Sequence, residues 1–268
     1  MVWPKEALVI APVADLRASA DNTSELVDQL HWGEVVRLLG TRESWRYVQA
    51  DDHYFGWVRS SLLNAMERGP RPWGEARVVA VPLAPVFEGM DSETSVIGHV
   101  PAGTRLIQQR ELPEPWEPVD ISGASGSPEP LRGYLSRDDT AVIRELPQRP
   151  PTADDLLATA EAFVGVPYLW GGTTALGMDC SGFVQQVYRL NGVRLDRDAD
   201  QQAMEGRPVD EALAGDLLFF GAERITHVAI STGGEGYLHA PQSGALIQRG
   251  TFATRAPGLG RRYLADPS

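Results

Sequence analysis

The chain of 268 residues contains one cysteine, Cys180, in the segment Asp-Cys-Ser-Gly-Phe at the predicted start of a helix. A lone cysteine forms no internal disulfide and no cysteine-based zinc site. At a helix start, free amide groups and the positive end of the helix dipole favour a thiolate and lower the thiol pKa, which suits a nucleophile. The preceding Gly171-Gly172 pair lets a loop approach closely. Because free cysteines are also often buried and inert, position alone leaves both interpretations open.

Two histidines can complete a catalytic arrangement around this thiol. Of the five histidines, only His227 and His239 lie in the last third of the chain. Each falls in a strand-like pattern, and residues 233–236 between them form a glycine-rich turn. Adjacent antiparallel strands would place the two rings side by side, with His227 as the base for Cys180 and His239 orienting its imidazole. Strand histidines are more often structural, but this combination favours nucleophilic catalysis.

An α+β domain is predicted to position these groups. Thr152 and Asp155 have the spacing of a capping box, followed by an apolar helix face that stops at Gly165. A second helix is predicted from Cys180 to Asn191-Gly192, and a shorter one over residues 200–205. Strands are predicted next, over residues 216–220, 226–231, 236–240, 246–249 and 261–264. Helices followed by strands favour an α+β fold with an antiparallel sheet.

Five segments of this region resemble, in order, the motifs of the NlpC/P60 cysteine peptidases, papain-like enzymes that cleave bacterial cell-wall peptides. The segments are Pro167–Gly172, Asp179–Phe183, Gly215–Phe220, His227–Ile230 and Leu238–Ala240. The resemblance covers about residues 152–264. It implies a nucleophile at Cys180, a base at His227 and an orienting group at His239. It also implies that Tyr168 helps the Cys180 amide stabilise an oxyanion, and it implies no metal and no cofactor.

The first half of the chain repeats itself. Ala7–Ala11 aligns with Ala76–Ala80, and Gly33, Trp45 and Gly56-Trp57 align with Gly103, Trp116 and Gly133-Tyr134. Short β-branched and aromatic runs, over residues 34–39, 45–49 and 56–59 in the first copy, predict small antiparallel barrels that resemble bacterial SH3-like domains. Trp45 and Trp57 are predicted core residues. The second copy is divergent, and its extra length, Leu112–Pro130, is predicted to be a loop.

The predicted fold is therefore a papain-like α+β catalytic domain, residues 152–268, preceded by two small all-β SH3-like barrels, residues 1–69 and 74–146. Proline-rich linkers are predicted over residues 69–72 and 146–151.

This layout resembles the γ-D-glutamyl-L-diamino acid endopeptidases that recycle murein peptides. In that group an acidic pocket, built partly by the first SH3-like domain, receives the free amine of an N-terminal L-alanine. The resemblance implies that the substrate contacts are Glu25, Tyr54, Trp170, Asp179, Ser181 and Asp198. Carboxylates suit this task because a buried ammonium must be paired. Glu25 could equally be a solvated surface residue. One departure is Ala199, where the group is expected to have serine, so a hydrogen bond to the substrate is missing.

Composition restricts the partners. The chain carries 24 Lys and Arg against 36 Asp and Glu, for a formal net charge of −12, which argues against nucleic acid or an anionic membrane as the main partner. The first residues lack the pattern of a signal peptide, and no apolar run is long enough to span a bilayer. We therefore expect a cytoplasmic protein, with a monomer favoured.

The sequence leaves three alternatives open. An exported wall hydrolase could act on intact peptidoglycan, using the SH3-like repeats as anchors. A binding protein could retain a vestigial peptidase domain, although the complete set of Cys180, His227 and His239 argues against it. An amidase or acyltransferase could use the same fold with a different pocket.

Overall fold

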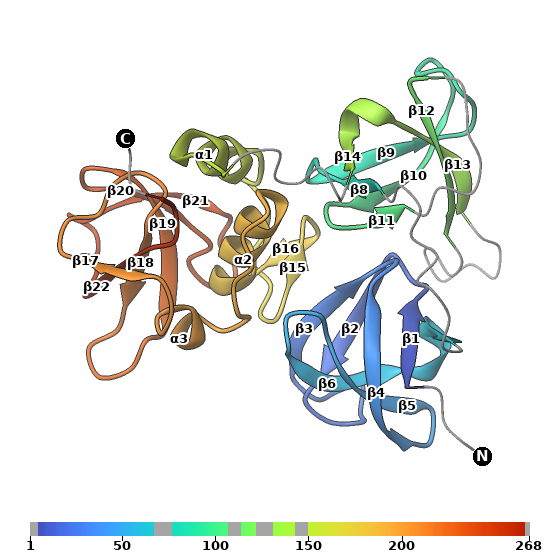
Figure 1. Cartoon of the computed structure of the whole chain (residues 1–268), viewed down its shortest axis with the longest axis horizontal. Helices are drawn as coiled ribbons and strands as arrows, with labels where there is room; N and C mark the ends of the chain where they lie inside the picture. Colours follow the sequence, from blue (N-terminus) through green and yellow to red (C-terminus); the bar gives the residue numbers. More distant parts are fainter. Residues whose placement is uncertain (1–4, 67–76, 107–113, 122–130, 143–149, 266–268) are drawn as a thin grey trace. The chain divides into compact units, whose positions relative to one another are not determined.

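The computed structural model describes residues 5–66, 77–106, 114–121, 131–142 and 150–265, and the chain divides into two compact units, Met1–Glu145 and Leu146–Ser268 (Figure 1). The predicted division into three domains remains a prediction. The linker predicted over residues 69–72, and all but the last two residues of the one over 146–151, lie outside the described residues. No helix in the described ranges is long and apolar enough to cross a membrane.

The first half of the N-terminal unit is a seven-stranded antiparallel sheet in the order β3-β2-β6-β5-β4-β1-β7. The three strands expected from the sequence correspond to β4, β5 and β6. The strands are β1 (Glu6–Val9), β2 (Val13–Arg17), β3 (Leu26–His31), β4 (Val35–Arg42), β5 (Trp45–Gln49), β6 (Phe55–Arg59) and β7 (Leu63–Met66).

Strand periodicity corrects one core prediction in this sheet. Trp45 is buried, as expected. Trp57 is only partly buried, because successive side chains of a strand point to opposite faces and its neighbours Gly56 and Val58 take the inner positions of β6. The Trp57 ring packs instead on Tyr47, with 5.2 Å between the ring centroids.

The second half of this unit has a four-stranded sheet, β10-β9-β13-β12, and a three-stranded sheet, β11-β8-β14. The strands are β8 (Arg77–Val79), β9 (Leu83–Phe87), β10 (Val96–Pro101), β11 (Arg105–Leu106), β12 (Trp116–Ile121), β13 (Leu131–Ser136) and β14 (Thr140–Val142).

Equivalent glycines show the internal repeat in backbone geometry. The Gly33 amide donates to the Val9 carbonyl at 2.9 Å, and the Gly103 amide donates to the Val79 carbonyl at 2.9 Å. Both glycines have positive φ, 82° and 85°, a conformation that glycine adopts without steric cost. However, Trp32 of the first half belongs to the hydrophobic core of the second half. The prediction of two separate barrels therefore remains a prediction.

The predicted loop Leu112–Pro130 contains a strand, which corrects that expectation. Within its described part, β12 pairs with β13 along its whole length, and Val119 is buried. Strand β12 is the last strand of its sheet, where Pro118 is tolerated because an edge position needs no second hydrogen-bonded neighbour. The remaining residues of that stretch, 112–113 and 122–130, lie outside the described residues.

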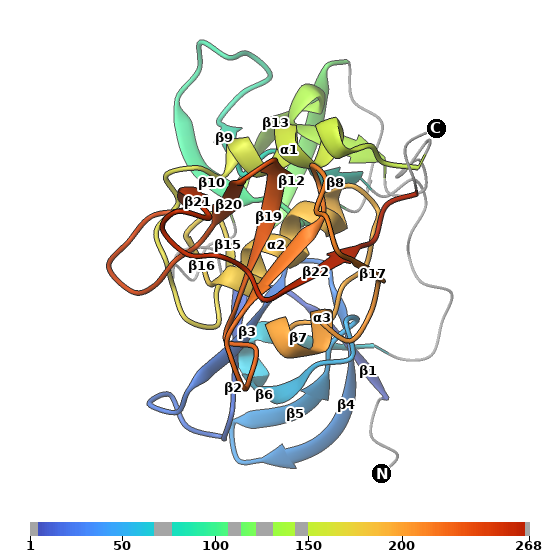
Figure 2. The same cartoon turned by 90° about the vertical axis from the view of Figure 1, so that its left-hand side faces the viewer.

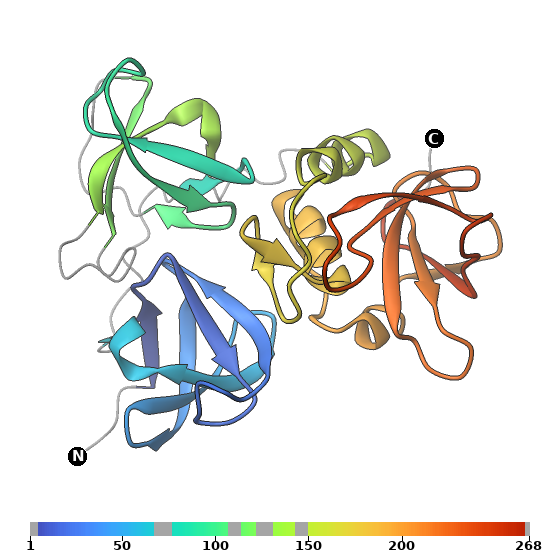
Figure 3. The same cartoon turned by 180° about the vertical axis from the view of Figure 1, so that it is seen from behind.

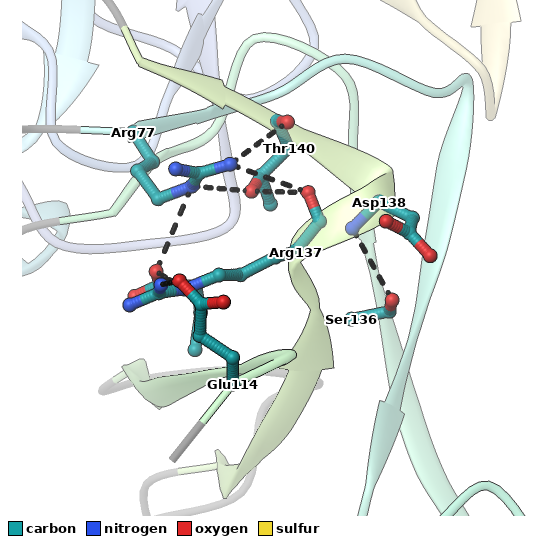
Figure 4. A network of polar contacts seen from close by, with 7 residues as sticks. Arg77, Glu114, Ser136, Arg137, Asp138 and Thr140 are labelled. Carbon is teal, nitrogen blue, oxygen red and sulfur yellow. Dashed lines mark hydrogen bonds and ion pairs between the residues drawn. The ribbon is translucent and has the colours of Figure 1, made fainter. Parts of the chain in front are cut away.

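A buried carboxylate joins the two sheets of this second half (Figure 4). Glu117 on β12 is 3% exposed and accepts from Arg137 Nε at 2.6 Å. Arg77 on β8 lies 3.6 Å from the same carboxylate, and its Nε donates to Thr140 Oγ1 at 2.6 Å. Arg137 also pairs with Glu114 at 2.7 Å. Two guanidinium groups thus compensate the one buried charge, as a stable buried ion requires.

The C-terminal unit begins with the predicted helices. Helix α1 (Ala153–Ala162) starts with the predicted capping box between Thr152 and Asp155. Helix α2 (Cys180–Leu190) begins at the predicted residue. Helix α3 (Ala199–Gln202) is a single turn that begins one residue earlier and ends three residues earlier than expected.

A six-stranded antiparallel sheet, in the order β17-β22-β18-β19-β20-β21, completes this unit and confirms the predicted α+β arrangement (Figure 2). Its strands are β17 (Arg207–Val209), β18 (Leu217–Phe220), β19 (His227–Gly233), β20 (Gly236–His239), β21 (Gln248–Thr251) and β22 (Leu259–Arg262). The last two lie about two residues from their predicted positions. Strand β17 and the two-residue strands β15 (Thr173–Thr174) and β16 (Gly177–Met178) were not predicted, because they are too short to show a periodic pattern.

Candidate active site

Cys180 is the first residue of α2, where the helix start is held by the residue before it. Asp179 is the N-cap, and its Oδ1 accepts from the Gly182 amide at 2.7 Å. An aspartate in this position satisfies an amide that the helix leaves unpaired. The thiol is therefore fixed at the end of a rigid element, as a positioned nucleophile requires.

Glycines allow the β15–β16 hairpin and the preceding loop to lie directly against this helix start (Figures 1 and 3). A Cβ on Gly182 would stand 2.2 Å from the Gly172 carbonyl oxygen, and a Cβ on Gly172 would stand 2.3 Å from the Gly177 carbonyl oxygen. Gly171 has a φ of 74°. The predicted close approach of the Gly171-Gly172 loop is confirmed, and side chains there would separate the loop from the nucleophile.

The two predicted histidines lie side by side on neighbouring strands. His227 begins β19 and His239 ends β20, and His227 Nε2 lies 2.9 Å from His239 Nδ1. His227 is 4% exposed. Since Nε2 of His227 is hydrogen-bonded to His239, Nδ1 of His227 is the ring nitrogen that can accept a proton from the thiol. The backbone of Val228, the residue next to His227, acts on the thiol and partly offsets the rise of its pKa.

Burial keeps all three groups neutral. It raises the pKa of the Cys180 thiol to about 11, and the neighbouring Asp179 carboxylate adds to this rise. Burial also lowers the pKa of His227 to about 3 and that of His239 to about 4. The neighbouring His239 lowers the pKa of His227 further, and the cationic Arg255 contributes to both shifts. The expected lowering of the thiol pKa is therefore wrong for the free site, because desolvation and a carboxylate outweigh the amide groups of the helix start.

Tyr168 lies beside the nucleophile. Its amide donates to the Ala245 carbonyl at 2.9 Å, and it forms a β-bridge with Met178, two residues before Cys180. Burial raises the pKa of its phenol well above the usual value, and the interactions with Cys180 and Asp179 raise it further. The phenol therefore stays protonated and can donate a hydrogen bond near the sulfur.

A buried arginine that was not predicted as a site residue pairs with Asp179. Arg197 is 1% exposed, and its guanidinium bonds both Asp179 oxygens, at 3.0 and 2.7 Å. It also donates to Ser181 Oγ at 2.9 Å. Asp179 accepts in addition from the Gly171 amide at 2.9 Å. The arginine compensates the carboxylate and fixes both residues that flank Cys180.

The remaining residues predicted to contact the substrate differ in exposure and lie in both units. Trp170 is 60% exposed. Asp198 precedes α3, and its amide donates to Gln201 Oε1 at 3.0 Å, while Ala199 begins that helix. Glu25 and Tyr54 belong to the other unit, where Glu25 is exposed and Tyr54 packs against the core of the seven-stranded sheet.

The substrate contacts of all six predicted residues therefore remain predictions. Among the described residues, no group of three or more His, Cys, Asp or Glu side chains could hold a metal ion.

Comparison with known families matches both halves of the chain. The NlpC/P60 family matches residues 165–256, and the bacterial dipeptidyl-peptidase Sh3 domain matches residues 16–63. A crystal structure of an NlpC/P60 family protein from Bacillus cereus ATCC 10987 aligns with a TM-score of 0.82 at 23% identity. The alignment covers 97% of this chain and 100% of that one, which shows a shared fold.

Two of the similar proteins match more than nine-tenths of this chain. A gamma-D-glutamyl-L-lysine dipeptidyl-peptidase of Bacillus cereus (strain ATCC 10987 / NRS 248) is 36% identical over 91% of this chain and 77% of its own length. Dipeptidyl-peptidase 6 of Lysinibacillus sphaericus is 30% identical over 97% of this chain and 96% of its own length. A gamma-D-glutamyl-L-lysine dipeptidyl-peptidase of Bacillus subtilis (strain 168) is 44% identical, but the match spans 38% of this chain and only 36% of that protein.

Proposed function

This chain belongs to the NlpC/P60 family of cysteine peptidases, and we propose that it cleaves the bond between γ-D-glutamate and a diamino acid in short murein peptides with a free N-terminal L-alanine. The observation that carries the proposal is the arrangement of a thiol at the start of α2 and a hydrogen-bonded histidine pair at the ends of β19 and β20. The names of the relatives support the substrate class.

The reaction starts from a neutral thiol and a neutral imidazole. His227 Nδ1 takes the proton of Cys180 as the sulfur attacks the γ-carbonyl carbon, so that thiolate and imidazolium form together with the bond rather than beforehand. His239 Nδ1 accepts from His227 Nε2–H, which fixes the tautomer and the ring orientation. Burial of His227 favours loss of this proton to the next acceptor.

Acyl transfer then proceeds in two steps. The tetrahedral oxyanion is stabilised by the Cys180 amide and the protonated phenol of Tyr168. Collapse breaks the carbon–nitrogen bond, and the leaving amine of the diamino acid takes the proton from His227. Water then attacks the thioester, gives a proton to the same imidazole and releases the dipeptide and the thiol.

Specificity for the free amine would come from an acidic pocket. We propose that Glu25, Tyr54, Trp170, Asp179, Ser181 and Asp198 contribute to it. Since Arg197 compensates Asp179, the remaining carboxylates must supply the charge that pairs with the ammonium. Ala199 offers no side-chain hydrogen bond, so the glutamate portion must be held by other groups.

We further propose that the protein acts as a monomer in the cytoplasm in murein recycling, with the divergent second SH3-like repeat forming a separate barrel that serves as a spacer. A catalytic thiol works in its reduced form, which cytosolic reductants maintain.

A comparison of two peptides tests the proposed function. The protein is incubated under reducing conditions with L-Ala-γ-D-Glu-diaminopimelate and with the same peptide acetylated at its amine. We expect cleavage of the free peptide and little cleavage of the acetylated one. Equal cleavage of both would exclude the amine pocket, and cleavage of neither would exclude this activity. The Glu25→Gln variant should lose discrimination between the peptides, whereas the exposed Glu223→Gln variant should retain it.

A further inference from the structure

A fixed arginine lies beside the histidine pair. Arg255 is in the segment between β21 and β22, and its amide donates to the Thr251 carbonyl at 3.1 Å. The same segment is held at both ends, because the Phe252 amide donates to the Glu235 carbonyl and the Gly258 amide to the Phe219 carbonyl, both at 2.9 Å. The backbone that carries Arg255 is thus tied to β18 and to the β19–β20 turn.

The guanidinium is positioned over an aromatic ring that also borders the base. Arg255 Cζ lies 5.1 Å from the centroid of the Phe220 ring, and the ring of His227 lies 5.3 Å from the same ring. Phe220 is 1% exposed, so its position is fixed by the core. A guanidinium over an aromatic face is attracted by the ring, which holds the cation close to the catalytic imidazole while Arg255 itself stays exposed.

Arg255 has no acidic partner among the described residues, and its guanidinium remains exposed. Other arginines of this unit are paired with carboxylates, as Arg197 is with Asp179, Arg249 with Glu161 and Arg262 with Asp216. In a chain with a formal net charge of −12, an unpaired and accessible guanidinium beside the base leaves its hydrogen-bond donors for an anion.

The proposed reaction fixes which part of the substrate approaches this cation. His227 must protonate the leaving amine, so the amine lies within hydrogen-bond distance of the imidazole at that step. The rest of the diamino acid is then attached close to His227, and Arg255 is a cation that lies near the same imidazole, over the Phe220 ring. In a tripeptide substrate the diamino acid carries a free carboxyl group next to its leaving amine, and diaminopimelate carries a second one at its far end.

We propose that Arg255 binds a carboxylate of the leaving diamino acid and so determines specificity on the product side of the scissile bond. This inference rests on the proposed function and adds to it a binding site for the leaving group. The interaction exists in both the bound substrate and the transition state, so its loss raises KM more than it lowers kcat.

Three peptides and three variants test the proposal. The peptides are L-Ala-γ-D-Glu-L-Lys with a free carboxylate, the same peptide amidated there, and L-Ala-γ-D-Glu-diaminopimelate. For R255M we expect kcat/KM to fall about tenfold or more on the two acidic peptides, mainly through KM, and to stay unchanged on the amide. R255K should recover part of the loss. R249M removes another exposed arginine and should behave like the unchanged protein.

The outcomes separate the two proposals. A larger loss on the diaminopimelate peptide than on the lysine acid assigns the far carboxylate to Arg255, and equal losses assign the one next to the leaving amine. Equal effects of R255M on all three peptides, or no effect on any of them, overturn the inference while the peptidase activity stands. If the unchanged protein cleaves none of the three peptides, the proposed function fails and the inference fails with it.

Discussion

Replacement of Arg197 by methionine should strongly destabilise the C-terminal unit. The substitution removes two bonds to Asp179, at 3.0 and 2.7 Å, and one to Ser181 Oγ at 2.9 Å. The arginine is 1% and the aspartate 7% exposed. Removal of one member of a buried ion pair costs about 3–5 kcal/mol. The remaining carboxylate keeps its helix-capping bonds, so a value near 3 kcal/mol is expected.

A double-mutant cycle measures the free-energy cost of leaving the buried Asp179 carboxylate without its cation. In R197M/D179N no buried carboxylate is left uncompensated, so the double variant should be more stable than R197M by about 1 kcal/mol or more. The single cysteine gives a readout specific to this unit, because alkylation of Cys180 during urea unfolding reports the opening of α2. The matched control is R249M, whose guanidinium is exposed. An R197M protein within 1 kcal/mol of the unchanged one, or a double variant less stable than R197M, would refute this reasoning.

Three further predictions concern the packing and titration of the site. A Cβ on Gly182 would stand 2.2 Å from a carbonyl oxygen, so G182A should cost about 1–3 kcal/mol and lower kcat/KM about 100-fold. In the matched variant G258A the nearest atom to the added Cβ is the Gly221 carbonyl oxygen, 3.7 Å away, so neither quantity should change. Equal effects of the two variants would contradict the packing argument. Because the pKa of the Cys180 thiol is raised to about 11, the rate of its alkylation by iodoacetamide should rise with pH from 7 to 10, and a plateau below pH 7 would indicate a preformed thiolate. His227 and His239 have pKa values lowered to about 3 and 4, so the unfolded chain binds more protons and the free energy of unfolding should fall as pH drops from about 6.5. The H227Q/H239Q variant should flatten this slope between pH 6.5 and 5, and an unchanged slope would contradict the assignment.

The sequence predicted the elements whose signals are local. The capping box at Thr152 and the start of α2 at Cys180 were found because caps and helical periodicity involve neighbouring residues. The pairing of His227 with His239 was found because a tight turn brings consecutive strands together. These local signals were sufficient to identify the catalytic candidates.

Features that depend on tertiary burial could not be predicted. Arg197 was overlooked because an arginine in a loop is usually exposed, and only the folded chain brings it to Asp179. The direction of the pKa shift of Cys180 was wrong because the helix start is visible in the sequence, whereas desolvation is not. Trp57 was predicted to lie in the core because tryptophan favours burial. Side chains of β6 alternate between its two faces, however, and Trp57 lies on the outer face.

The most direct test of the central claim is a mass measurement of the acyl-enzyme. The reaction with L-Ala-γ-D-Glu-diaminopimelate is quenched in acid within the first turnover, and the protein is digested and analysed by mass spectrometry. The account predicts an L-Ala-D-Glu thioester on the peptide that contains Cys180, and neither adduct nor turnover in the C180A variant. Turnover that persists in C180A would contradict it.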